Sequence, residues 1–120
     1  MSSENLKPGM SAEIETVVDD KLVVKHVGGA GVLSTPSMIG LMERAGIQAV
    51  QAHLPEGHTT VGFEVNVKHI AATPFGKKVT ARAELIEIDG RKLTFKIEAH
   101  DEDKQVGVGT HRRAIIKTQK

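Results

Sequence analysis

The stretch that decides the fold is TPSMIGLMERAGIQAVQAHL, residues 35–54. Thr35-Pro36 supplies an N-cap hydroxyl followed by a proline at the first helical position, and Ser34 is the competing cap. Pro55-Glu56-Gly57 stops the run after about five helical turns. At ~100° per residue, apolar side chains cover most of the helix surface. This wide arc, which predicts a helix enclosed on most sides, consists of Met38, Leu41, Met42, Ala45, Ala49, Val50 and Ala52.

The sequence on either side of this helix alternates with the period of a β-strand. Residues 10–18 and the short stretch 22–27 precede the helix, and four long strands follow it from Thr59 onward. Asp89-Gly90 is a strong hairpin signal, and we expect the four strands to be antiparallel neighbours joined by hairpins. Together these elements predict an α+β hotdog fold, an antiparallel β-sheet wrapped around one long central helix.

A chain of 120 residues is expected to form one domain. Residues 1–9 are interpreted as a flexible N-terminal arm that ends at Pro8-Gly9, and residues 10–120 as the single hotdog domain. A sheet that wraps one helix leaves an edge strand free. Pairing of that edge with a second copy predicts a homodimer or a dimer of dimers.

Composition excludes several classes of protein. Sixteen Lys and Arg against fifteen Asp and Glu leave a net charge of +1, so no nucleic acid partner is indicated. No apolar run approaches the ~20 residues of a membrane span, and the polar start MSSENLKPGM is not a secretory signal peptide. The absence of Cys excludes disulfides, thiolate metal sites and a Cys nucleophile. We therefore expect a cytoplasmic protein that binds neither membrane nor nucleic acid.

Two polar residues occupy positions where the pattern calls for apolar side chains. Glu43 falls beside Ile47 on the helical wheel, away from the polar face. Steps of two from Val61 through Val67 place His69 on the core side of its strand. A carboxylate and an imidazole facing one apolar interior are costly unless they are paired or functional, so their presence favours a site.

These residues also have structural explanations. Thr35 is first of all an N-cap, Glu43 could be solvated or paired with Arg44 or Lys68, and an inward His is more often a hydrogen-bonded core residue. No spacing typical of metal-binding histidines occurs, so no metal is indicated.

The remaining histidines signal less. His26 adjoins the glycine-rich segment 28–31, which we interpret as a mobile loop leading to the helix, and could line the mouth of a site. His100 and His111 fall on outward-facing positions of their strands.

Several motifs, taken in order, resemble those of one family. The motifs are Gly31–Met38 (GVLSTPSM), Leu41-Met42-Glu43, Thr60-Val61-Gly62, Val67-Lys68-His69 and Ala72-Thr73-Pro74 with Gly76. In order and spacing they resemble the hotdog thioesterases of the fluoroacetyl-CoA thioesterase-like family over roughly residues 8–116. The eight-residue interval from Thr35 to Glu43 and the twenty-six-residue interval from Glu43 to His69 match the family's catalytic Thr, Glu and His.

The resemblance implies hydrolysis of an acyl-CoA thioester to free acid and CoA. Thr35 would be the hydroxyl at the attacked carbonyl, as nucleophile or as the group that positions water. Glu43 would be the general base or the partner that activates the hydroxyl or water, and His69 would transfer a proton to the departing thiolate. This chemistry needs no metal and no redox cofactor, since CoA is part of the substrate.

The resemblance also implies substrate-binding residues. Gly62 would bring its N–H to the carbonyl oxygen, and Arg113 would lie near the end of the last strand. Two further candidates come from the sequence itself and not from the resemblance: Gly29 in the glycine-rich loop and the adjoining His26, both expected at the pocket entrance. In the fluoroacetyl enzyme aromatic residues gate this entrance, whereas residues 26–31 contain none, so fluoroacetyl selectivity is not implied.

Two alternative functions remain open on the same fold. One is a non-catalytic protein that binds acyl-CoA, and the other is a hydratase-type hotdog enzyme that acts on enoyl-CoA.

Overall fold

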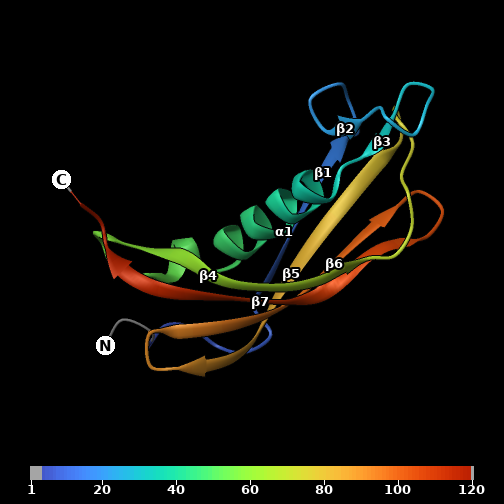
Figure 1. The fold of residues 1–120 in the computed structure, drawn as a ribbon. Helices are drawn as coiled ribbons and strands as arrows, with labels where there is room; N and C mark the ends of the chain where they lie inside the picture. Colours follow the sequence, from blue (N-terminus) through green and yellow to red (C-terminus); the bar gives the residue numbers. More distant parts are fainter. Residues whose placement is uncertain (1–3, 120) are drawn as a thin grey trace.

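A single helix, α1 (Thr35–Val50), lies across the concave face of a curved antiparallel sheet (Figure 1). The computed structural model describes residues 4–119. In spatial order the five strands are β1 (Ser11–Val17), β5 (Lys78–Asp89), β6 (Lys92–Asp101), β7 (Gln105–Lys117) and β4 (His58–His69). A small hairpin of β2 (Val23–Val24) and β3 (Val32–Leu33) precedes the helix. The predicted sheet wrapped around one helix is confirmed.

The start of α1 differs from the prediction in one residue. Ser34, not Thr35, is the N-cap, since its Oγ accepts a hydrogen bond from the Ser37 N–H at 3.2 Å. Thr35 is the first helical residue and Pro36 the second. Because Ser34 satisfies the helix end, the Thr35 hydroxyl is free for another partner.

The end of α1 also comes earlier than predicted. The α-helix stops at Val50, and a 3₁₀ turn over Gln51–His53 carries the chain toward Pro55. Helices commonly tighten in this way in their last turn. As a result Ala52, which the periodicity assigns to the apolar arc, is exposed.

The core forms between α1 and the inner face of the sheet. The remaining six residues of the predicted arc are all buried, and they pack mainly toward β5 and β1. Small side chains on β5 let the helix approach, and large ones on β6 fill the remaining space. The sheet contributes Val79, Ala81, Ala83, Leu85, Leu93, Phe95, Ile97 and Ala99.

The strand order corrects one expectation. β5, β6 and β7 are successive antiparallel neighbours as predicted, but β4 pairs with β7 and not with β5. The connection over residues 70–77 is longer than the two to five residues of a common hairpin. It carries the chain from β4 on one side of the sheet to β5 near the other. β4 is therefore an edge strand, as is β1.

A β-bulge interrupts β4. Gly62 pairs with Arg113 and Glu64 with Arg112, so Phe63 is an extra residue without a partner on β7. The extra residue shifts the alternation of side chains by one position. Odd-numbered residues before the bulge therefore face away from the core, and odd-numbered residues after it face the core. Val61 and Phe63, which the period places with Val65 and His69 on the core side, are 43% and 46% exposed.

The segments before the helix are more ordered than their composition indicates. Within the arm predicted for residues 1–9, Leu6 is buried in the core, and Gly9 donates a hydrogen bond to the Leu85 carbonyl at 2.7 Å. Residues 1–3 lie outside the described part of the chain. The glycine-rich segment forms the tip of the β2–β3 hairpin, and a Cβ on Gly31 would lie 2.8 Å from the Val24 carbonyl oxygen. Within residues 4–119 no helix is long and apolar enough to cross a membrane.

Candidate active site

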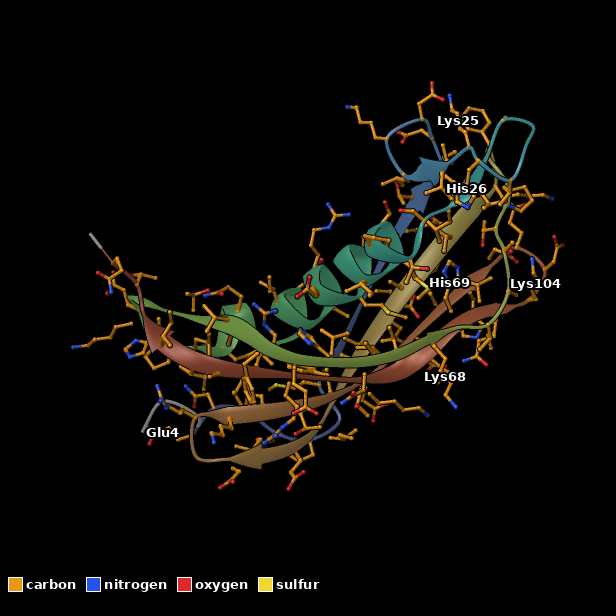
Figure 2. The ribbon with its side chains drawn as sticks, in the orientation of Figure 1. Glu4, Lys25, His26, Lys68, His69 and Lys104 are labelled. Carbon is orange, nitrogen blue, oxygen red and sulfur yellow. The ribbon has the colours of Figure 1, made fainter. Side chains whose placement is uncertain are left out.

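Thr35 and His69 form the first of two polar clusters. The Thr35 Oγ1 and the His69 Nδ1 lie 2.8 Å apart, joining the first residue of α1 to the last residue of β4. His69 lies near the N-terminal end of the helix (Figure 2). The inward orientation predicted for His69 is confirmed, and the hydroxyl that the sequence assigns to a cap is instead its partner.

The state of His69 suits proton transfer. Burial lowers the pKa of His69 from its ordinary value of 6.5, and the Ala71 backbone raises it by less. The imidazole is therefore neutral at neutral pH, and its Nδ1 can accept the Thr35 hydroxyl proton. His69 Nε2 is buried and has no hydrogen-bond partner among the residues that the structure describes. Buried nitrogens without a partner are rare in folded proteins.

Glu43, Gly62 and Arg113 form the second cluster. A Cβ placed on Gly62 would lie 3.3 Å from Glu43 Oε2 and 3.1 Å from Arg113 Nη1. All three line an open cleft of about 610 Å³, together with Leu22, Ser37, Gly40, Leu41, Arg44, Ile47, Thr60 and Val61. Because residue 62 is glycine, the strand backbone can lie directly against a carboxylate and a guanidinium.

Arg113 is held firmly in this cluster. Its Nε donates to Thr60 Oγ1 at 2.7 Å, and its Nη2 donates to the Thr60 carbonyl oxygen at 2.9 Å. A third bond runs from Nη1 to His111 Nε2 at 3.1 Å. Burial lowers the pKa of Arg113 from its ordinary value and the nearby Glu43 raises it by less, but an arginine still carries its charge at neutral pH. Two of its five N–H groups remain for other acceptors.

The two clusters do not meet within one chain. Thr35 and Glu43 are eight residues apart on α1, a rise of about 12 Å along the helix axis. Gly62 and His69 lie at a separation of roughly 20 Å along β4. Among the described residues no hydrogen bond joins Glu43 to Thr35 or to His69. The structure thus divides the residues that the sequence assigns to one site into two sets, one at the N-terminal end of the helix and one beside its middle.

The two predicted entrance residues lie apart from both clusters. His26 and Gly29 are exposed at the tip of the β2–β3 hairpin, and His26 is separate from His69 in Figure 2. A Cβ on Gly29 would meet nothing within 4 Å. Neither residue lines the cleft of Glu43 or the smaller cavity beside His69. Within residues 4–119 no three His, Asp or Glu side chains are grouped closely enough to hold a metal ion.

His111 is the residue that the alternation misplaces. It is fully buried, with 0% exposure, although the pattern assigns it to the outer face of β7. Gly107 and Gly109 carry no side chain, so they hide the period in the first half of this strand. The signal lies in the other half, where steps of two back from buried Ile115 reach Arg113 and then His111.

Comparisons with known proteins identify the family of this chain. Residues 12–119 match the family described as fluoroacetyl-CoA-specific thioesterase. The chain is 43% identical over 89 residues to the fluoroacetyl-CoA thioesterase of Streptantibioticus cattleyicolor. That alignment spans 74% of this chain and 64% of the curated relative, less than two thirds of its length.

Solved structures resemble the whole domain. The fluoroacetyl-CoA thioesterase FlK superposes with a TM-score of 0.86 at 34% identity, over 95% of this chain and 90% of that one. A mutant of FlK in complex with fluoroacetate and CoA has a TM-score of 0.85 at 35% identity, over 93% and 96% of the two chains. A thioesterase superfamily member from Thermus thermophilus has a TM-score of 0.85 at 28% identity, over 95% and 86%.

Proposed function

This chain belongs to the family of fluoroacetyl-CoA-specific thioesterases, and we propose that it hydrolyses an acyl-CoA thioester to a free acid and CoA. The observation that carries the proposal is the 2.8 Å hydrogen bond between Thr35 and His69. A hydroxyl bonded to a neutral imidazole is the arrangement that activates a nucleophile or orients a water molecule.

The proton transfers can be assigned to the first cluster. His69 accepts a proton at Nδ1 when the oxygen of Thr35, or of a water bound to it, attacks the thioester carbonyl carbon. The C–S bond then breaks, and His69 returns the proton to the departing CoA thiolate. Attack by water gives the free acid directly. Attack by Thr35 leaves the acyl group as an ester on its oxygen, and a water then hydrolyses this ester, with His69 taking the proton of the water and returning it to Thr35. A thiolate leaves easily, so the reaction asks for no metal or redox group.

The second cluster suits the charge that develops on the carbonyl. The oxygen becomes an anion during the attack, and a site for it needs preorganised donors. The remaining N–H groups of Arg113 and the Gly62 backbone are the donors that we assign to this task. Glu43 accepts a hydrogen bond from the attacking water or the Thr35 hydroxyl and so orients it for the attack.

A homodimer would bring the two clusters together. β4 is an edge strand with one side unpaired, and its residues Val61 and Phe63 are exposed. If two β4 strands pair antiparallel about an axis at Asn66, with Phe63 again the extra residue, Gly62 lies opposite the partner's His69. Each site then consists of Thr35 and His69 from one protomer and Glu43, Gly62 and Arg113 from the other. Within one chain the two clusters lie too far apart to act on one thioester, which supports this assembly.

Release of CoA tests the activity. A panel of acyl-CoAs is incubated with the pure protein and a thiol reagent, beside the variants Glu43→Gln and Glu15→Gln. We expect turnover by the wild type and by Glu15→Gln, whose carboxylate is exposed on β1. Glu43→Gln should lose about 10²–10⁴-fold.

Two outcomes would contradict the proposal. Measurable binding without CoA release above buffer would indicate a non-catalytic acyl-CoA-binding protein. Loss of the enoyl chromophore without CoA release would indicate a hydratase.

A further inference from the structure

His111 is a fully buried histidine that the proposed reaction does not use. Its Nδ1 lies 2.9 Å from the Glu64 carbonyl oxygen, and its Nε2 lies 3.1 Å from Arg113 Nη1. A buried imidazole with a partner on each nitrogen is fixed in both position and orientation.

The two partners determine where the proton of His111 resides. A backbone carbonyl can only accept, so Nδ1 carries the proton and donates it to Glu64. An arginine can only donate, so the unprotonated Nε2 accepts from Arg113. Burial lowers the pKa of His111; the bond to the Glu64 backbone raises it, the charge of Arg113 lowers it and Glu43 raises it. The ring is thus neutral and links β4 to Arg113.

His111 also lies directly against the second cluster. A Cβ on Gly62 would be 2.9 Å from His111 Cε1, and one on Gly46 of α1 would be 3.6 Å from His111 Cδ2. From β6 the ring of Phe95 lies beside it, with centroids 6.3 Å apart. The charged groups that face it are therefore Arg113 on its own strand and Glu43 on the helix.

We propose that His111 is a positioning residue that acts through Arg113. Its bond to Nη1 fixes the rotation of the guanidinium, so that the free N–H groups point to the carbonyl oxygen beside Gly62. Its bond to the Glu64 carbonyl oxygen keeps the proton on Nδ1, so that Nε2 remains the acceptor for Arg113. This inference rests on the proposed thioesterase function, and it assigns a role to a residue that touches no substrate.

Two conservative variants separate the two bonds. In His111→Gln the side-chain amide reaches the place of Nε2, so an acceptor for Arg113 is retained and the bond to Glu64 is lost. In His111→Asn the amide takes the place of Nδ1, so the bond to Glu64 is retained and the acceptor for Arg113 is lost. Both variants remove an aromatic ring from the core, which makes them matched controls for the loss of packing.

We expect the two His111 variants to differ in kcat. His111→Gln should retain most of the wild-type kcat, whereas His111→Asn should lose about 10²-fold, the scale of a misplaced group. KM should change little in either. In an Arg113→Lys background, His111→Asn should cause little further loss, because the residue that it positions is already absent. Equal losses in kcat for the two variants, or a full additional loss in the double variant, would overturn the proposal.

A spectroscopic readout makes the test independent of activity. NMR of the wild type and of His111→Gln should show separate, slowly exchanging Nη–H signals for Arg113, since its rotation is blocked. His111→Asn should merge these signals. Merged signals in the wild type, or unchanged signals in His111→Asn, would overturn the positioning role. A wild type that shows the signals but releases no CoA would instead contradict the proposed function.

Discussion

Gly62 and His69 face the same side of β4 although they are an odd number of positions apart along the strand. A Cβ on Gly62 would point at Glu43 of α1, and His69 bonds to Thr35 of the same helix. In a regular strand such residues lie on opposite faces. The bulge at Phe63 adds one residue and restores a common face. This single irregularity lets one strand present both groups to the helix side.

Substitution of Gly62 tests the close approach that the bulge creates. Gly62→Ala should reduce kcat about 10²-fold, because its Cβ would come within 2.9 Å of His111 and 3.1 Å of Arg113. Overpacking should also lower the free energy of unfolding by about 1–3 kcal/mol. Enzyme assays and urea denaturation measure the two effects.

Gly46→Ala is the matched control. A Cβ at Gly46 meets nothing closer than 3.6 Å, so the helix should gain about 0.5–1 kcal/mol and activity should persist. Full activity in Gly62→Ala would contradict the assignment of this backbone to the site.

The acid limb of the pH profile tests His69 as the base. Its pKa is lowered from 6.5 by burial, so the neutral form is lost only as the pH falls below that value. We expect kcat/KM to be level near neutral pH and to fall below 6.5. His100→Gln, on an exposed side chain, should leave the profile unchanged. A limb centred above 6.5 would argue against His69.

Asp101 links the segment after His69 to the sheet. Its carboxylate accepts hydrogen bonds from Thr73 at 3.1 Å and from the Lys104 ammonium at 2.6 Å. Burial raises the pKa of Asp101, but these bonds and those from the backbone of Asp103 and Lys104 bring it down to about 2. The charged form is therefore favoured by the folded state.

The free energy of unfolding should depend on the ionisation of the Asp101 carboxyl group. Its contribution is complete above 3.8, the ordinary value, and is lost as the pH falls toward 2. Asp101→Asn should lower the free energy of unfolding at neutral pH by about 1–3 kcal/mol and flatten the fall in acid. Asp89→Asn, at the exposed end of β5, is the control. The same acid sensitivity in Asp101→Asn as in the wild type would contradict the assignment.

Substrate discrimination tests the β2–β3 hairpin. Its tip carries His26 and Gly29 but no aromatic side chain, and it leaves both cavities uncovered. We expect kcat/KM for fluoroacetyl-CoA and acetyl-CoA to differ by no more than ~10–200-fold, the scale of one small group in a hydrophobic pocket. A preference beyond about 10⁴-fold would show that another segment selects the acyl group.

Local periodicity was sufficient for much of this fold. The apolar arc predicts α1 and its enclosure, and alternation predicts the long strands. Glu43 and His69 stood out because each interrupts a pattern that their neighbours obey. Such interruptions are visible in one sequence because the side chains that break the rule are charged or titratable.

What the sequence did not reveal depends on relations between distant segments. The pairing of β4 with β7 and the extra residue at Phe63 are set by tertiary packing. The apolar alternation in the sequence runs through Phe63 without interruption, and it does not indicate which strand β4 pairs with. His111 was missed because two glycines precede it on β7. The division into two clusters could not be predicted either, since a spacing along the chain does not say whether residues meet within one protomer.

The central claim is that an acyl-CoA thioester is hydrolysed at a site shared by two protomers. Thr35→Ala and Glu43→Gln chains are co-expressed with different tags, and the doubly tagged heterodimer is purified. Each parental homodimer should be inactive, but the heterodimer holds one intact site and should release CoA at about half the wild-type rate per dimer. A folded heterodimer as inactive as its parents would contradict the shared site.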